Sequence, residues 1–134
     1  MNPNRHILFV CLHGAAKSVL AAADCERLAA ARGLRISADF AGTEPAADIA
    51  PAVAAALHAD GVDLGGKKPR LVTPQDVAGA DRVVAFGCPL GEAATPGTRV
   101  DQWTDVPAVS DGLPAARAAI RARLERLLDE WKTP

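Results

Sequence analysis

A continuous apolar run, followed at once by a loop of small residues, is the feature of this chain that most restricts its fold. Residues 6–11 read HILFVC, and such a run suits a central strand that is buried on both faces of a parallel sheet. Residues 13–16, HGAA, interrupt the run, and residues 18–32 then have the alanine-rich composition of a helix. We expect Ser18 to be the N-cap of this helix and Gly33 to end it.

Candidate strands and helices alternate along the rest of the chain, which is the pattern of a parallel α/β sheet. Further strands are expected at residues 35–40, 81–86 and 98–102, and further helices at residues 51–59, from Thr73 onward and over the C-terminal stretch. The last helix is the clearest, because apolar residues recur on one face: Ile120, Leu124, Leu127, Leu128 and Trp131. We predict a three-layer α/β fold around a four-stranded parallel sheet, as one domain over residues 1–134.

The composition argues against several classes of protein. A net charge of −1 lacks the basic excess of a nucleic-acid binder, and 49% hydrophobic with 23% charged residues is an ordinary globular balance. We see neither a long apolar run that would span a membrane nor a signal-peptide pattern, so we expect a cytoplasmic protein with no membrane partner. Three cysteines do not suggest a secreted disulfide framework, and no His/Cys spacing predicts a metal site.

The loop at residues 11–18 is the expected site of chemistry. Parallel sheets bind ligands outside the carboxyl ends of their strands, and the first amides of the following helix lack internal partners, so they favour an anion. The same field favours the thiolate form of Cys11. Gly14 permits a tight curl, Lys17 adds a positive charge, and the Ser18 hydroxyl can donate to the sulfur. The expected oxyanion-binding residues are Leu12, His13, Gly14, Ala15, Ala16 and Lys17.

Two other interpretations fit parts of this loop. A free cysteine in a strand-to-helix turn is often only a packing residue. Residues 14–18 also have some likeness to a nucleotide-binding P-loop, but the pattern G-x-x-x-x-G-K-[ST] requires glycine at positions where Cys11 and Ala16 stand. The nucleotide interpretation is therefore set aside, and the cysteine at a strand end, the small-residue loop and the Lys-Ser pair together favour a functional site.

The loop and several later segments resemble the low-molecular-weight protein tyrosine phosphatases and their relatives, the thiol-dependent arsenate reductases. The signature of that family is a cysteine, five residues and Arg-Ser after a hydrophobic strand; Cys11 and Ser18 match it, and His13 is similar to the arsenate reductase branch. The resemblance continues in residues 41–45, 61–64, 69–73 and 81–88, and in Trp103 with the closing helix. It implies a low-molecular-weight phosphatase-like fold for most of the chain.

The resemblance also implies a reaction. Cys11 would attack phosphorus or arsenic and form a covalent adduct, while the loop amides and the cation at position 17 bind the equatorial oxygens. The implied function is hydrolysis of a phosphomonoester or reduction of arsenate, without a bound cofactor. A reductase would also need a thiol donor, either external or from the chain itself, and Cys88 is the candidate resolving thiol.

Three departures from the family pattern predict weakened activity. Lys17 replaces an arginine, keeping the charge but losing the planar fork that binds two oxygens. The family's acid loop reads Trp-Asp-x-Pro-Asp-Pro, whereas residues 103–109 read WTDVPAV. One alignment places Ala108 where the general acid belongs, and another gives that role to Asp105. Cys88 has no second cysteine in the loop after it. The alternative function is a protein that binds phosphate or arsenate in the same loop without turnover.

Overall fold

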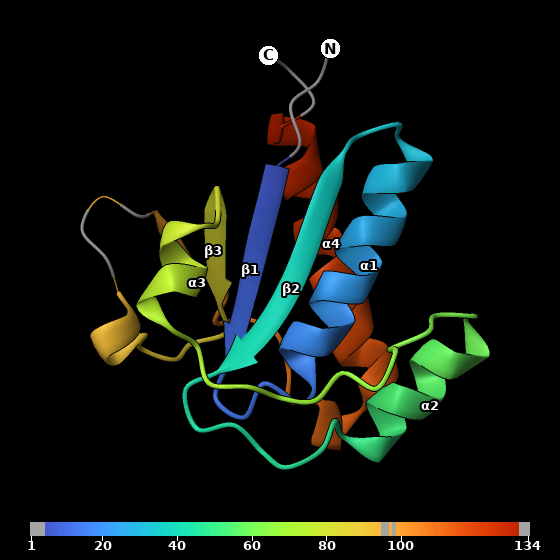
Figure 1. Cartoon of the computed structure of the whole chain (residues 1–134). Coiled ribbons are helices and arrows are strands. Elements are labelled where there is room, and N and C mark those ends of the chain that lie inside the picture. The colour runs from blue at the N-terminus through green and yellow to red at the C-terminus, as the bar shows by residue number, and fades with distance from the viewer. Residues whose placement is uncertain (1–4, 95–96, 98, 132–134) are drawn as a thin grey trace.

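The computed structural model describes residues 5–94, 97 and 99–131 (Figure 1). In chain order its elements are β1 (Arg5–Cys11), α1 (Lys17–Ala31), β2 (Ile36–Gly42), α2 (Pro51–Ala59), α3 (Pro74–Ala78), β3 (Arg82–Ala85), the 3-10 turn η1 (Gly91–Ala93), β4 (Val100–Gln102), the 3-10 turn η2 (Val109–Asp111) and α4 (Leu113–Trp131). The predicted fourth strand began at Thr98, which lies outside the described residues.

The four strands form one parallel sheet, as the sequence predicts, and their order in it is β2-β1-β3-β4. The apolar run is the inner strand β1, in which Ile7 to Val10 are at most 1% exposed. Its register pairs Cys11 with Gly42 of β2 and Val10 with Ala85 of β3. The carboxyl ends of the inner strands therefore meet at one edge of the sheet, around Cys11.

Helices cover both faces of the sheet, which confirms the predicted three-layer architecture. Because side chains alternate along a strand, Ile7 and Phe9 pack into the core shared with α1, α2 and α4. Leu8 and Val10 point to the other face, where Val77 of α3 joins their cluster. Figure 1 shows α1 and α4 on one side of the strands and α3 on the other.

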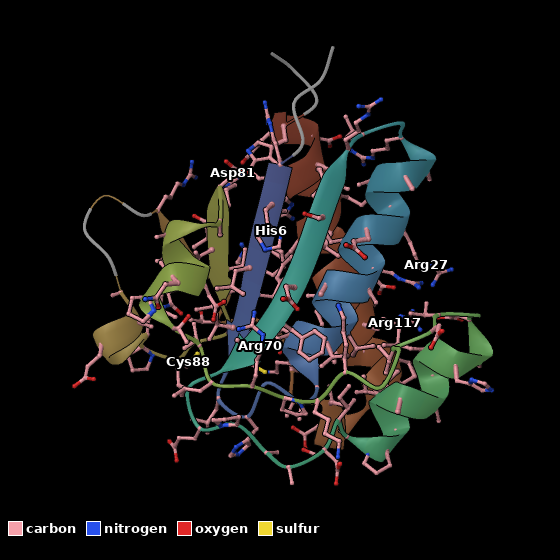
Figure 2. The ribbon with its side chains drawn as sticks, viewed as in Figure 1. His6, Arg27, Arg70, Asp81, Cys88 and Arg117 are labelled. Carbon is pink, nitrogen blue, oxygen red and sulfur yellow. The ribbon has the colours of Figure 1, made fainter. Side chains whose placement is uncertain are left out.

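A buried ion-pair network fastens α1 to α4. Asp24 of α1 is 1% exposed, and Arg117 of α4 holds it with two hydrogen bonds of 3.0 and 2.8 Å. Burial alone would raise the pKa of Asp24, but hydrogen bonds from Arg117 and Arg121 keep that pKa below its ordinary value. Arg117, labelled in Figure 2, also pairs with Asp60, which follows α2. The network fixes the helix whose first turn forms part of the site described below.

Local signals in the sequence set several element boundaries correctly. The predicted helix at 51–59 is observed with the same limits, and Thr73 caps α3 through a capping box with Asp76. The apolar face predicted for α4 is buried at Ile120, Leu124, Leu127 and Leu128, while Trp131 is half-buried. No helix among the described residues is long and apolar enough to cross a membrane.

Candidate active site

Cys11 ends β1 and lies beside the first turn of α1. Its thiol is 8% exposed, and Sγ lies 3.0 Å from Oγ of Ser18. Ser18 is inside α1, and Ala16 occupies the N-cap without a side-chain hydrogen bond. The prediction that Ser18 caps the helix is therefore wrong, because its hydroxyl faces the sulfur. The expected contact between Ser18 and Cys11 is present.

The carbonyl groups of the loop at residues 11–18, hereafter the Cys11 loop, are turned toward the segment that follows β2. Backbone amides of residues 43–50 donate hydrogen bonds to four of them. The pairs are Thr43 N to Cys11 O at 3.3 Å, Glu44 N to Leu12 O at 2.7 Å, Ala46 N to His13 O at 3.0 Å and Ala50 N to Ala15 O at 2.9 Å.

The amide groups of these peptide units point the opposite way. A trans peptide is planar, so the N–H of one residue is antiparallel to the C=O of the residue before it. The amides of Leu12, His13, Gly14 and Ala16 therefore point away from residues 43–50, and they donate to no acceptor among the described residues. The first amides of α1 also lack acceptors within the helix. The Cys11 loop thus presents a set of unused N–H donors at a helix N-terminus, an arrangement suited to an anion.

Two glycines allow this loop to close against β2. Gly14 has a left-handed backbone, with φ of +59°. A Cβ on Gly42 would lie 2.6 Å from N of Gly14 and 2.7 Å from C of His13, closer than real Cβ atoms come. The sequence indicated the turn at Gly14 but not this contact. The signal that was available is the second glycine at the end of the neighbouring strand, opposite Cys11 in the sheet.

Lys17 connects the Cys11 loop to the segment after β4. Its Nζ donates a 3.0 Å hydrogen bond to the carbonyl oxygen of Val106, whose side chain is buried in the core. Lys17 is the first residue of α1, and its ammonium group is anchored on Val106. This bond holds residues 103–109 against the N-terminal end of α1. Sequence reasoning assigned Lys17 a charge but did not indicate Val106 as its partner.

The His13 side chain lies outside the set of amides. Its Nδ1 is 3.0 Å from the carbonyl oxygen of Glu44, and the residue is exposed. The imidazole thus fastens the Cys11 loop to the segment after β2. Only the backbone amide of His13 belongs to the set of unused N–H donors that point away from residues 43–50.

Asp105 is held by an arginine of α4. Its Oδ1 lies 3.2 Å from Nε and 2.8 Å from Nη2 of Arg123, and its side chain is 62% exposed. The hydrogen bond from Arg123 lowers the pKa of Asp105. A general acid must carry a proton at the working pH, so this ion pair opposes such a role. Ala108, the other alignment's position, offers no proton.

Cys88 follows β3 at the carboxyl end of the sheet (Figure 2), on the same side as Cys11. It is 6% exposed, and its thiol donates to the carbonyl oxygen of Val10 at 3.7 Å. Burial raises the pKa of Cys88, and charge on Cys11 raises it further. Cys25 is fully buried in α1, and burial raises its pKa to about 12, as expected for a core residue. The described residues contain no cluster of metal-ligating side chains.

Comparison with known proteins agrees with this geometry. Residues 6–95 match the family "Low molecular weight phosphotyrosine protein phosphatase". A Halobacterium salinarum protein named "Putative arsenate reductase" is 30% identical over 97 residues, which are 71% of this chain and 68% of that protein. A Corynebacterium glutamicum thioredoxin-dependent arsenate reductase has a TM-score of 0.80 and 26% identity over 96% of this chain, but this chain covers only 62% of that protein.

A further solved structure covers both chains almost completely. The arsenate reductase of Archaeoglobus fulgidus has a TM-score of 0.73 and 27% identity, over 92% of this chain and 98% of that one. The family and these structural neighbours are enzymes. The match over residues 6–95, with a shared four-stranded parallel fold, shows that this chain belongs to the low molecular weight phosphotyrosine protein phosphatase family.

Proposed function

We propose that this protein is a cysteine-dependent enzyme acting on a tetrahedral oxyanion, with Cys11 as nucleophile. The observation that carries the proposal is the orientation of the Cys11 loop. Its carbonyls are satisfied by residues 43–50, so its amides are left as a preorganised set of donors beside the sulfur. Such donors stabilise charge on the equatorial oxygens as the reaction proceeds, without reorganising.

The first step follows from the neighbours of the sulfur. The Ser18 hydroxyl lies 3.0 Å from the sulfur and can donate a hydrogen bond to it. The sulfur of Cys11 attacks arsenic or phosphorus, a sulfur bond to that atom forms, and one oxygen leaves with its electron pair as water or alcohol after taking a proton. The ammonium of Lys17 supplies positive charge next to the loop.

The distribution of aromatic residues favours arsenate over an aryl phosphate. Recognition of a phenyl ring draws on stacking against another ring. This chain has no tyrosine, and Phe9, Phe40, Phe86 and Trp103 are at most 9% exposed. Trp131 lies against Arg5, at the amino end of β1 and away from Cys11. Among the described residues, no phenyl or indole ring is therefore presented to a substrate at the Cys11 loop, whereas a bare oxyanion needs only amides and charge.

Reduction of arsenate requires a thiol to accept the adduct. In the proposed sequence, a second sulfur attacks Cys11 Sγ, a disulfide forms, and arsenic leaves with the electron pair of the broken S–As bond as arsenite. Cys88 is the candidate for this role because it follows β3, the strand paired with β1, at the same edge of the sheet as Cys11. Its raised pKa favours the protonated thiol. An external thiol donor then regenerates the enzyme, or takes the place of Cys88.

The test measures arsenite formed from arsenate with a dithiol reductant, and in parallel hydrolysis of p-nitrophenyl phosphate. We expect arsenate reduction to exceed hydrolysis and both to vanish in Cys11→Ser. Loss of the reaction in Cys88→Ser identifies Cys88 as the second thiol, whereas retention assigns that step to the external thiol. Cys25→Ala is the matched control, because this thiol is buried in the core. Oxyanion-induced stabilisation with no product in the wild type would overturn catalysis and leave a binding protein.

A further inference from the structure

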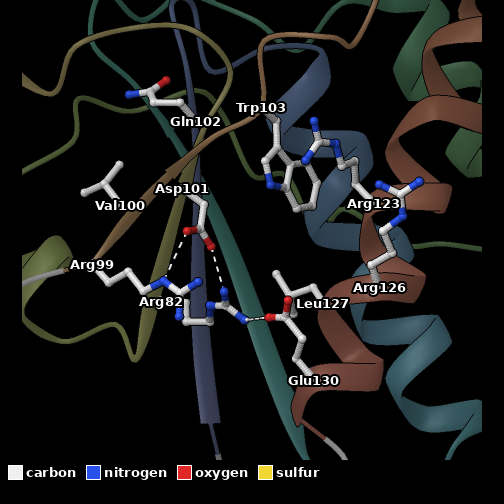
Figure 3. Close-up of a pocket in the computed structure, with 10 residues that line it drawn as sticks. All are labelled: Arg82, Arg99, Val100, Asp101, Gln102, Trp103, Arg123, Arg126, Leu127 and Glu130. Atoms are coloured by element: carbon white, nitrogen blue, oxygen red, sulfur yellow. Dashed lines mark hydrogen bonds and ion pairs between the residues drawn. The ribbon is translucent and has the colours of Figure 1, made fainter.

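A second site rich in positive charge lies along the outer strand β4, between that strand and the C-terminal half of α4 (Figure 3). The cleft has a volume of about 460 Å³, within the range of small-molecule sites. Its lining residues are Arg82, Arg99, Val100, Asp101, Gln102, Trp103, Arg123, Arg126, Leu127 and Glu130. Four arginines on one cleft are unusual for a chain whose net charge is −1.

The two carboxylates of the cleft are already paired. Arg82 donates to Glu130 at 2.9 Å and to Asp101 at 2.8 Å, and Arg99 donates to Asp101 at 3.2 Å. These contacts, drawn in Figure 3, neutralise both acidic groups. Arg123 and Arg126 are then left in excess of the carboxylates that line the cleft, although Arg123 also pairs with Asp105 outside it.

Two guanidinium groups retain unused donors. Arg82 is 6% exposed, and its Nε is a buried nitrogen with no hydrogen-bond partner. A buried donor left unsatisfied costs free energy, which an acceptor from a ligand would recover. Arg126 is exposed and forms no hydrogen bond or salt bridge with the described residues, although its charge helps to lower the pKa of Asp105. An anion in this cleft would therefore meet donors that no protein group occupies.

We propose that this cleft binds a small polyanion carrying phosphoryl groups, at a site separate from the Cys11 loop. Guanidinium forks bind phosphoryl oxygens in pairs, and the cleft is too large for a single tetrahedral ion to fill. Arg99, Arg123 and Arg126 are the accessible contacts, and Arg82 lies behind them, bound to Asp101 and Glu130. The cleft begins at the amino ends of β3 and β4, whereas Cys11 lies at the carboxyl end of β1.

Binding in the cleft has a built-in optical signal. The guanidinium carbon of Arg123 lies 6.0 Å from the centre of the Trp103 ring, and the same group pairs with Asp105. An anion that recruits Arg123 competes with Asp105 for it. Binding therefore changes the surroundings of Trp103, and the pKa of Asp105 moves back toward its ordinary value.

The experiment titrates inorganic pyrophosphate into the full chain after Cys11 has been carboxymethylated, so that the Cys11 loop is closed to anions. Calorimetry and the emission of the two tryptophans, Trp103 beside Arg123 and Trp131 beside Arg82, report binding. We expect saturable binding that weakens with added salt, and a loss of at least about tenfold in affinity in the double variant Arg99→Gln, Arg126→Gln. Arg99 and Arg126 are both exposed, so replacing them should not disturb the core. Arg82 is not replaced, because it is buried and paired with Asp101 and Glu130.

Arg35→Gln is the control for each of the single variants Arg99→Gln and Arg126→Gln, because it removes one positive charge from an exposed position before β2, at the opposite edge of the sheet. Its affinity should equal that of the unsubstituted chain. The proposal is overturned if the double variant binds pyrophosphate as well as the unsubstituted chain, if Arg35→Gln weakens binding as much as the single variants do, or if no saturable binding occurs. Arsenate turnover of the unmodified variants is measured separately, so failure here is distinct from failure of the proposed function.

Discussion

The loops that follow β1 and β4 meet at the same end of the molecule, yet the family pattern is kept in the first except at Lys17 and is altered more deeply in the second. The Cys11 loop keeps its cysteine, small residues and serine, and its carbonyls are fixed by residues 43–50. Residues 103–109 keep their position, through the contact between Lys17 and Val106, but place no free acid there. Asp105 is committed to Arg123, and position 108 is alanine.

The difference lies in what each loop contributes to chemistry. The Cys11 loop works through backbone amides, which no single side-chain replacement removes while the glycines remain. A general acid works through one carboxyl group, so one substitution deletes it. Under the proposed function, we therefore expect chemistry that needs binding and a nucleophile to be retained, and chemistry that needs strong leaving-group protonation to be weakened. The predictions below test each side of this comparison.

The largest effect is expected from Gly42→Ala, which disturbs the backbone amides of the Cys11 loop. The new Cβ would lie 2.6 Å from N of Gly14, so the loop must shift and several N–H donors lose their aim. Losing even one such donor costs about 10²–10³ in rate, so we expect a loss of about 10³ or more in arsenate turnover. Overpacking should also lower the free energy of unfolding by about 1–3 kcal/mol.

Gly79→Ala controls for the loss of a glycine, because its Cβ would approach no atom closer than 3.3 Å. Steady-state kinetics and urea unfolding of both variants separate the two effects. Full turnover in Gly42→Ala would show that the close approach of Gly42 to the Cys11 loop is unnecessary for catalysis.

The next effect comes from restoring the missing acid with Ala108→Asp. Position 108 precedes η2, where an aspartate is also a favoured cap. A positioned general acid contributes about 10²-fold or more, so hydrolysis of p-nitrophenyl phosphate should rise by about that factor. Ala108→Asn has nearly the same shape without the proton and should leave the rate unchanged. Equal rates in both variants would place the proton donor elsewhere.

A smaller effect is expected where the two loops are joined, at Lys17. Lys17→Gln removes the charge and weakens the bond to Val106, so we expect about a tenfold rise in KM for arsenate. Faster hydrogen exchange should appear in residues 103–109, which a simple loss of charge does not produce. Lys17→Arg restores charge and a donor, and should recover most of the affinity. Lys68→Gln, in an exposed loop, controls for net charge.

The smallest effect is expected from Asp105→Asn. Asp105 is mostly exposed and bound to Arg123, so turnover at neutral pH should change by less than about twofold. The pKa of Asp105 is lowered on folding, so its pair with Arg123 stabilises the protein above the unfolded pKa of about 3.9 and ceases to do so as pH falls through the folded pKa. Thermal unfolding of both proteins should therefore converge in acid. A large fall in turnover would make Asp105 the acid after all.

Much of the fold could be predicted because its signals are local. The apolar run of β1, the proline and glycine that bound α2, and the Thr73 cap each depend on residues a few positions apart. The nucleophile and the small-residue loop are also contiguous. The N-cap of α1 was misassigned because Ser18 has two possible partners, and only packing decides that its hydroxyl faces Cys11.

By itself, then, the sequence determined which strand is central, where the thiol stands and which turn can hold an anion, since short-range sterics and hydrophobic patterning settle these. Tertiary structure decided the rest. The approach of Gly42 to Gly14, the bond from Lys17 to Val106 and the pairing of Asp105 with Arg123 join positions far apart in the chain. Those contacts depend on how the sheet twists and the helices pack, which no local pattern encodes.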